Sequence, residues 1–308
     1  MHAQDGVLQK VCDRFEHELG NRLMRLSMLV LVIGGGDLGT GTAHRLHRAG
    51  FKVAVSELGQ PSVIRRAVAF ASAVYEGRIQ VEGVEARLAE GKAEIESLLK
   101  QGIVPVIVDS NGKARAVLTP DVIVDARIAK RNLGTTLADA PIVIGLGPGF
   151  TAGRDVHAVI ETMRGHNLGR VILQGSAEAD THVPGLVHGS GRERVLWAPC
   201  SGRFESDAYI GDHVEAGEIV ARVAQQSIHA SISGVLRGLL HSGFLVREGQ
   251  KVGDIDPRGI AEYCFTISDK ARAIGGAVLE AILYLRLHLT ARHCSDKLAR
   301  ERSGDDDL

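Results

Sequence analysis

The chain has 308 residues, of which 44% are hydrophobic, 4% aromatic and 24% charged, and its formal net charge is −1. This length allows two or three domains with cores of their own. The near-zero charge and the few aromatic residues argue against a nucleic-acid partner and against an anionic membrane surface, because those need a basic field or stacking side chains. We therefore expect no nucleic acid and no membrane among its partners, and oligomer formation stays open.

Residues 1–27 are expected to be an N-terminal extension, in which the stretch from Val7 to Leu26 predicts a polar, weakly amphipathic helix. The extension lacks the apolar core of a signal peptide, and no apolar run is long enough to span a membrane. Four cysteines are widely spread and form no CxxC pair, which argues against a zinc site or a disulfide framework. We expect a cytoplasmic protein without a metal site.

The most informative stretch is an apolar strand pattern that runs directly into Gly34-Gly-Gly-Asp-Leu-Gly39, followed by a helical pattern and a second strand. This is the order of a dinucleotide-binding βαβ unit. In such a unit Gly34 allows a tight turn and Gly36 lets the backbone approach a pyrophosphate. Gly39 lets the helix pack closely. The sequence therefore predicts a ligand site at this turn.

The residues around the turn extend this predicted site. The helix expected after the turn presents free N–H groups to an anion at its N-terminus. Glu57 follows the second strand, roughly 20 residues after the turn, where an acidic residue accepts hydrogen bonds from a ribose. We predict a cofactor site that includes Gly34, Gly36, Asp37, Gly39 and Glu57; the alternative is a scaffold without a ligand, in which Glu57 is a solvated strand end.

From residue 28 to about residue 173 strand patterns alternate with helical patterns. The expected strands are Leu29–Ile33, Val53–Ser56, Val104–Val108, Val122–Asp125, Pro141–Gly145 and Val171–Leu173. The expected helices are Thr42–Ala49, Ser62–Ala73, Ala93–Lys100 and Asp155–Met163. Their alternation predicts a doubly wound, Rossmann-like α/β domain over residues 28–194.

A basic stretch leaves one of these strands at Asp125 and continues through Arg127, Lys130 and Arg131. Such cations could hold a phosphate or a carboxylate. A solvated loop with internal salt bridges explains the same residues equally well. We keep the four residues as candidate ligand contacts.

A second glycine loop, with Gly145, Gly147 and Gly149, follows the strand expected at residues 141–145. Its backbone N–H groups could cradle a phosphate, although no GK[ST] follows as in a Walker motif. We include these glycines in the predicted cofactor site. The alternative is simply a tight turn between a strand and a helix.

The candidates for catalysis are weak, and whether the chain is an enzyme stays open. His157 and Glu161 lie four residues apart on an expected helix, where they would share a face as an acid–base or metal pair. Such pairs are mostly structural. Cys264 could be a nucleophile or a sulfur or selenium carrier, but a buried cysteine is more often a small apolar residue.

The segment 195–257 has short strand patterns with turn glycines, and its two halves repeat an A-x-x-x-G motif, at Ala198 and at Ala230. The repeat predicts a small all-β barrel-sandwich module similar to biotinyl and lipoyl carrier domains. Those domains attach their group to a lysine between the halves, yet no lysine occurs between Arg131 and Gln250. We therefore expect no lipoyl or biotin and a structural or docking role.

The last segment, residues 258–308, predicts a long helix that ends near His293, followed by an acidic tail. Ser268 is a plausible N-cap, and Asp269 is favourable in the first turn of the helix.

Several motifs together resemble one family, the YqeB-type accessory proteins of the selenium-dependent molybdenum hydroxylase system. The motifs lie at residues 34–50, 124–136, 145–153, 155–162, 253–259 and 268–276. The resemblance implies a role in the maturation of a client molybdenum hydroxylase, such as a xanthine- or purine-type dehydrogenase with labile selenium. It identifies no catalytic residue.

Three hypotheses follow. The first is a maturation factor that binds a nucleotide-like ligand, either NAD(P) or the molybdenum cofactor in its dinucleotide form. Both offer a pyrophosphate and a ribose, so the glycine loops do not distinguish them. The second is an NAD(P)-dependent oxidoreductase, for which His157 is the candidate proton donor. The third is a scaffold that docks the client enzyme.

Overall fold

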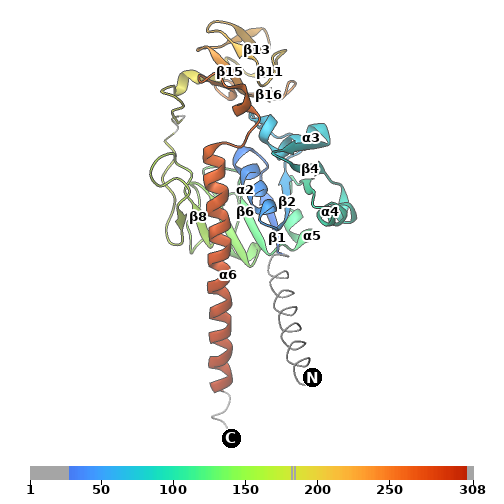
Figure 1. The fold of residues 1–308 in the computed structure, drawn as a ribbon, viewed down its shortest axis with the longest axis vertical. Coiled ribbons are helices and arrows are strands. Elements are labelled where there is room, and N and C mark those ends of the chain that lie inside the picture. Colours follow the sequence, from blue (N-terminus) through green and yellow to red (C-terminus); the bar gives the residue numbers. More distant parts are fainter. Residues whose placement is uncertain (1–27, 182, 184, 304–308) are drawn as a thin grey trace, which may run out of the picture.

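The computed structural model describes residues 28–181, 183 and 185–303. The helix expected between residues 7 and 26 and the end of the acidic tail lie outside these residues. A nine-stranded sheet forms the body of the molecule, two four-stranded sheets lie at one end of it, and the long helix α6 (Asp269–Ser303) runs along the body and extends beyond it (Figure 1). Among the described helices, none combines the length and the hydropathy that crossing a membrane requires.

The large sheet has the strand order β3-β4-β5-β2-β1-β6-β7-β8-β9. From β4 to β8 neighbouring strands are parallel, whereas β3 and β9 pair antiparallel at the two edges. The strands are β1 (Leu29–Ile33), β2 (Lys52–Glu57), β3 (Arg78–Val81), β4 (Val84–Leu88), β5 (Val104–Val108), β6 (Val122–Asp125), β7 (Ile142–Leu146), β8 (Ala158–Ile160) and β9 (Val171–Ile172).

Both faces of the large sheet are buried, which explains the nearly continuous apolar sequence of its central strands. One face packs against α2 (Asp37–Arg48), α6 and the turns η1 (Arg66–Val68) and η2 (Phe70–Ser72). The other face packs against α4 (Gly91–Lys100), α5 (Ala114–Leu118) and the loop around Phe150. The short helix α3 (Ala73–Glu76) follows η2.

The helices α2 and α6 cross at small residues. A Cβ on Gly41 would lie 2.7 Å from Ala271 Cβ, and one on Gly275 would lie 2.7 Å from Gly41 O. Side chains at these glycines would force the helices apart. At the start of α6, Ser268 Oγ accepts a 3.2 Å hydrogen bond from the backbone N–H of Ala271, which confirms the predicted N-cap.

Residues 195–256 form two antiparallel sheets, in the orders β10-β17-β15-β12 and β14-β13-β11-β16. They enclose a second core, which includes Phe204, Leu236 and Ile255. The backbone of Leu239 joins them to the body, because its N–H donates to Ile64 O and its carbonyl accepts from Arg66 Nε, each at 2.7 Å. The strands are β10 (Val195–Trp197), β11 (Gly202–Glu205), β12 (His213–Val214), β13 (Ile219–Val223), β14 (Gln226–His229), β15 (Gly234–Leu239), β16 (Leu245–Val246) and β17 (Lys251–Asp256).

The predicted fold class, a doubly wound Rossmann-like domain followed by a barrel-sandwich module, is wrong. The large sheet is mixed, with an antiparallel strand at each edge, and residues 195–256 make two separate four-stranded sheets. The helix expected at Asp155–Met163 is instead β8, since its Ala158–Ile160 segment is fully buried beside β7. The segment Ser62–Ala73, expected to be one helix, instead begins without helix and continues as the two short turns η1 and η2, and the β3–β4 hairpin was not predicted.

Candidate functional site

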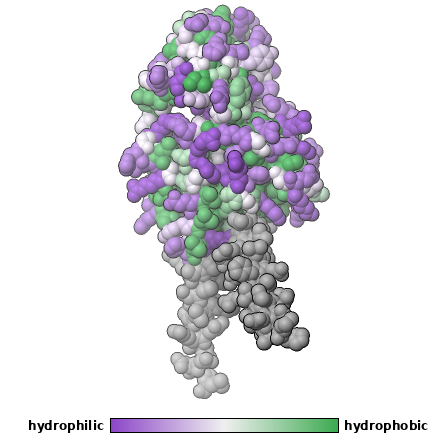
Figure 2. All heavy atoms as spheres, viewed as in Figure 1, coloured by the Kyte–Doolittle hydropathy of each residue, from purple (hydrophilic) through white to green (hydrophobic). Residues whose placement is uncertain are grey.

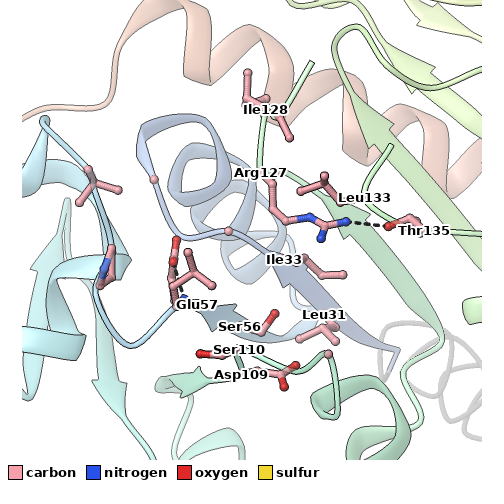
Figure 3. A pocket seen from close by; sticks show the side chains of 18 of the residues that line it. Leu31, Ile33, Ser56, Glu57, Asp109, Ser110, Arg127, Ile128, Leu133 and Thr135 are labelled. Atoms are coloured by element: carbon pink, nitrogen blue, oxygen red, sulfur yellow. Dashed lines mark hydrogen bonds between the residues drawn. The ribbon is translucent and has the colours of Figure 1, made fainter. Parts of the chain in front are cut away.

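A cavity of about 820 Å³ opens at the carboxyl ends of β1, β2, β5 and β6. Strands β1 and β6 are neighbours in the sheet although they lie far apart in sequence, and such an edge is where parallel strands usually hold a ligand. Figure 3 shows Leu31 and Ile33 of β1 at the cavity, together with charged residues from the ends of the neighbouring strands. The volume is in the range of small-molecule and cofactor sites.

The first glycine turn forms the middle of the cavity wall. Gly34 has φ +97°, and its N–H donates to Ser56 O at 2.8 Å, which turns the chain sharply off β1. Gly39 packs against this turn so closely that a Cβ would overlap Gly34 O. The predicted conformational roles of both glycines are confirmed.

Gly36 differs from these two glycines because it has free space around it. It is the N-cap of α2 with φ −68°, and no side chain caps the helix there. A Cβ built on Gly36 would meet only Val63 Cγ1, at 3.5 Å. The first turn of α2 therefore faces a cavity with open backbone N–H groups, as in helix termini that bind anions.

Glu57, at the end of β2, binds the glycine turn. Its Oε1 accepts 2.8 Å from the N–H of Gly35 and its Oε2 accepts 2.7 Å from the N–H of Leu58. Burial raises the pKa of the Glu57 carboxyl, and these two hydrogen bonds oppose the rise. A carboxylate has about four acceptor positions, so Glu57 keeps acceptor capacity for a ligand hydroxyl.

Asp37 lies at the cavity but is paired away from it. Arg65 Nη1 donates to Asp37 Oδ1 at 2.9 Å, and Arg65 is almost fully buried. The Nη2 of Arg65 also donates to the carbonyls of Tyr263 and Thr266, just before α6. Asp37 thus links the start of α2 to the segment before α6.

Arg127 follows β6 and is held by a buried carboxylate. Asp125 is 1% exposed and accepts from Arg127 Nε at 3.0 Å, from Arg127 Nη2, and from Thr135 Oγ1 at 2.7 Å. Arg127 Nη2 also donates to Thr135 Oγ1 at 3.0 Å (Figure 3). The hydrogen bond to Asp125 raises the pKa of Arg127, so the guanidinium at the cavity is permanently charged and fixed in orientation.

The second glycine loop serves internal packing, and its glycines do not line this cavity. A Cβ on Gly145 would lie 2.5 Å from the Phe150 ring, and one on Gly147 would lie 2.6 Å from Thr162 Oγ1. A Cβ on Gly149 would lie 2.5 Å from the backbone N of Arg131. At Gly149 the loop therefore packs directly against the backbone of the basic stretch.

The two other cations of the basic stretch also lie outside the cavity lining. Lys130 Nζ lies 2.6 Å from an Asp180 carboxylate oxygen, and Arg131 is exposed. Of the four predicted residues of this stretch, the structure brings Arg127 to the cavity, with Asp125 behind it.

His157 and Glu161 do not form a pair. They flank the extended strand β8 rather than sharing a helix face, and four extended residues span about 13 Å. His157 Nδ1 accepts from the N–H of Val143 at 3.0 Å, and burial lowers the pKa of this imidazole. Both oxygens of the buried Glu161 accept backbone N–H groups, from Met163 and Glu178.

Cys264 is fully buried and its Sγ contacts Leu236 O at 3.6 Å. Burial raises the pKa of the thiol, which disfavours the reactive thiolate. Within the described part of the chain, no group of three or more His, Cys, Asp or Glu side chains is arranged to hold a metal ion.

Several residues of the cavity were not predicted from the sequence, among them Val63, Asp109, Arg115 and Thr135. Asp109 could have been predicted from the sequence, because it follows the expected strand Val104–Val108 and the carboxyl ends of parallel strands meet at one edge of a sheet. Its two oxygens accept the N–H groups of Lys113 and Ala114 at the start of α5. Thr135 lies in the motif at residues 124–136 but was not singled out there, and no signal in the sequence indicated Val63, which comes from a loop.

No family model matches the chain. Among solved structures, it is similar to a product-bound ectoine utilization protein EutE (DoeB) from Ruegeria pomeroyi, with 12% identity over 74% of this chain and 85% of that chain and a TM-score of 0.23. It is also similar to an aspartoacylase family protein from Mesorhizobium loti, with 11% identity, 74% and 85% coverage and a TM-score of 0.24. Likeness at these scores carries no argument about activity.

The chain is 50% identical over 257 residues, or 83% of its length, to the protein YqeB of Escherichia coli (strain K12), and the match covers 48% of that protein. This identity supports the resemblance of the sequence motifs to YqeB-type proteins. The chain spans about half the length of the curated relative that it matches.

Proposed function

We propose that the chain binds a nucleotide-like ligand in the cavity at the ends of β1, β2, β5 and β6, and that it is an accessory factor in the maturation of a selenium-dependent molybdenum hydroxylase. The ligand is a dinucleotide or the molybdenum cofactor in its dinucleotide form. The observation that carries the proposal is the free space above Gly36 at the uncapped start of α2.

The chemistry of the cavity supports this class of ligand. A pyrophosphate fits the start of α2, because backbone N–H groups and the helix dipole favour negative charge there. Glu57 can accept from a ribose hydroxyl beside it. Apolar side chains, among them Leu58, Pro61 and Val63, offer a surface for a flat base.

The biological role rests on the resemblance of the sequence motifs to YqeB-type accessory proteins, a resemblance that the 50% identity to YqeB supports. An accessory factor must also contact its client. Figure 2 shows apolar side chains interspersed with hydrophilic ones over the part of the molecule formed by β10 to β17. Tyr209, Ile219 and Leu245 of this part are 74%, 48% and 70% exposed, and we assign client docking to it.

The oxidoreductase hypothesis receives no comparable support. Its proton donor, His157, lies outside the cavity lining and is occupied by the N–H of Val143. Among the described residues that line the cavity there is no His, Lys, Cys or Tyr to replace it.

Two experiments test the proposal. Calorimetry with ADP should detect binding to the purified chain, and no binding of any nucleoside diphosphate would reject the site. Deletion of the gene should leave a selenium-dependent hydroxylase synthesised at a normal level but inactive, with less molybdenum or selenium in the purified enzyme. Normal activity and normal cofactor content in the deletion strain would reject the maturation role.

A further inference from the structure

We propose that Arg127 makes the cavity selective for nucleoside diphosphates whose second arm ends in an anionic group, and that Asp125 is the positioning residue for Arg127. The inference rests on the proposed nucleotide site and adds the chemical class of the second arm. The glycine turn would bind the pyrophosphate of any such ligand, whereas Arg127 would select among them by the charge of the second arm.

The two sides of the cavity differ in charge. Figure 3 shows Glu57 and Arg127 on either side of the turn between β1 and α2. Contacts place both residues directly against this turn: Gly35 N–H donates to Glu57, and a Cβ on Gly34 would lie 3.2 Å from Arg127 Cα. A pyrophosphate at the start of α2 would therefore have an acidic wall at Glu57 on one side and a cationic wall at Arg127 on the other, since Arg115, the other arginine that lines the cavity, is paired with Asp139.

The acidic wall favours the sugar that carries the base. Glu57 accepts hydroxyl groups but repels phosphates, so the nucleoside lies on its side of the turn. Asp109, on the same side, has both oxygens engaged by the start of α5. The other arm of the ligand then extends past the turn toward Arg127, Leu133 and Thr135.

Arg127 has donors left for that arm. Its Nε and Nη2 are used by Asp125 and Thr135, but its Nη1 has no hydrogen-bond partner among the residues that the structure describes. The side chain is 30% exposed and lines the cavity. A planar guanidinium fixed on two of its three nitrogens presents the third in one direction, which suits a carboxylate or phosphate oxygen.

The carboxylate of Asp125 is too deeply buried to act on the ligand itself. It is 1% exposed and all of its observed hydrogen bonds are to Arg127 and Thr135. Its effect on binding therefore passes through the orientation of Arg127. A cationic group, such as an oxidised nicotinamide ring, is disfavoured beside the guanidinium because like charges repel.

The test uses two ligands that differ only at the second arm, UDP-glucose and UDP-glucuronate. The base, the ribose and the pyrophosphate are identical, so the ratio of the two affinities measures the effect of the carboxylate alone. We expect UDP-glucuronate to bind about ten-fold more tightly, which corresponds to one charge-assisted hydrogen bond. In a second pair, NAD⁺ should bind no more tightly than ADP-ribose, because its additional nicotinamide group is cationic.

Variants distinguish an effect of Arg127 on ligand selectivity from an effect on the stability of the protein. The ratio should fall to about one in Arg127→Gln and in the double variant Asp125→Asn/Arg127→Gln, which leaves no buried unpaired carboxylate. Thr135→Val, which removes one hydroxyl that orients Arg127, should lower the ratio. Arg87→Gln is the matched control, because Arg87 pairs with Glu85 two residues before it, away from the cavity.

The outcomes are distinguishable. If ADP fails to bind, the nucleotide site is rejected and this inference falls with it. If ADP binds but UDP-glucose and UDP-glucuronate bind equally well, or NAD⁺ binds ten-fold more tightly than ADP-ribose, only the second-arm inference is overturned. If Arg127→Gln weakens ADP as strongly as UDP-glucuronate, Arg127 contacts the pyrophosphate and the inference is likewise wrong.

Discussion

The backbone N–H of Gly35 donates a 2.8 Å hydrogen bond to Oε1 of Glu57. This bond ties the first glycine turn to the end of β2, so two features that the sequence places 22 residues apart form one structure. The carboxylate is at the same time a support of the turn and a wall of the cavity. Changes at Glu57 should therefore affect both stability and binding.

Gly36→Val should abolish binding of pyrophosphate ligands while the fold persists. The backbone at Gly36 has φ −68° and a Cβ would meet only Val63, so the larger side chain fills the ligand's space rather than the protein's. Calorimetry with ADP, together with thermal unfolding, measures both effects. Equal binding by the variant and the wild type would show that the ligand does not bind at this turn.

Glu57→Gln should change the pH dependence of stability. Burial raises the pKa of Glu57, so the folded state holds the proton more tightly than the unfolded chain. The resulting stabilisation is present below the unfolded pKa of about 4.3 and is lost as the pH rises through the folded pKa. The free energy of unfolding of Glu57→Gln should therefore rise relative to that of the wild type as the pH increases above about 4. Denaturant titrations at several pH values test this, and a constant difference would contradict it.

The ribose interaction at Glu57 gives a separate expectation. Glu57→Ala should weaken nucleotide binding by about 1–3 kcal/mol, the cost of losing a hydrogen bond to a charged group. The comparison is made with ADP and with inorganic pyrophosphate, which has no ribose. An equal loss for both ligands would show that the effect comes from a disturbed glycine turn.

Two adjacent glycines of α6 should respond to alanine in opposite directions. Gly275→Ala would place a Cβ 2.7 Å from Gly41 O, and such overpacking costs about 1–3 kcal/mol. Gly276→Ala meets nothing within 4 Å and should stabilise the protein by about 0.5–1 kcal/mol through helix propensity. Chemical denaturation measures both changes. Similar effects of the two substitutions would contradict the close crossing of α2 and α6.

Residues 195–256 should carry neither lipoyl nor biotinyl groups. No lysine occurs between Arg131 and Gln250, and Lys251 lies in β17, 3.6 Å from Asp254. Burial lowers the pKa of this remaining amine. Intact-mass measurement and peptide mapping of the protein from its native host provide the test. A lipoyl or biotinyl increment within these residues would disprove the expectation.

Local signals were sufficient where they determine the conformation by themselves. The strands Leu29–Ile33, Val104–Val108 and Val122–Asp125 have the predicted bounds, because each is a short apolar, β-branched run. The glycine turn was equally predictable, since Gly34 has the positive φ and Gly39 the close contact that require glycine. Ser268 caps α6 as its position before a helical pattern indicated.

Elsewhere the same kinds of pattern were ambiguous. The apolar residues of the 155–163 segment fit a helix and a strand equally well, and pairing with β7 decided for the strand. The repeat in residues 195–256 indicated short strands but not how they divide into two sheets, because pairing depends on partners that lie far along the chain.

The sequence by itself thus determined the strand, glycine turn and helix that begin the candidate site, because sterics and backbone freedom act within a few residues. Only the tertiary structure decided which charged groups meet there. Asp125, Arg127 and Thr135 form one hydrogen-bonded group, Glu57 closes on Gly35, and Lys130 and Arg131 lie outside the cavity lining. These contacts depend on the order of strands in the sheet and on loop packing, which burial of the whole chain determines.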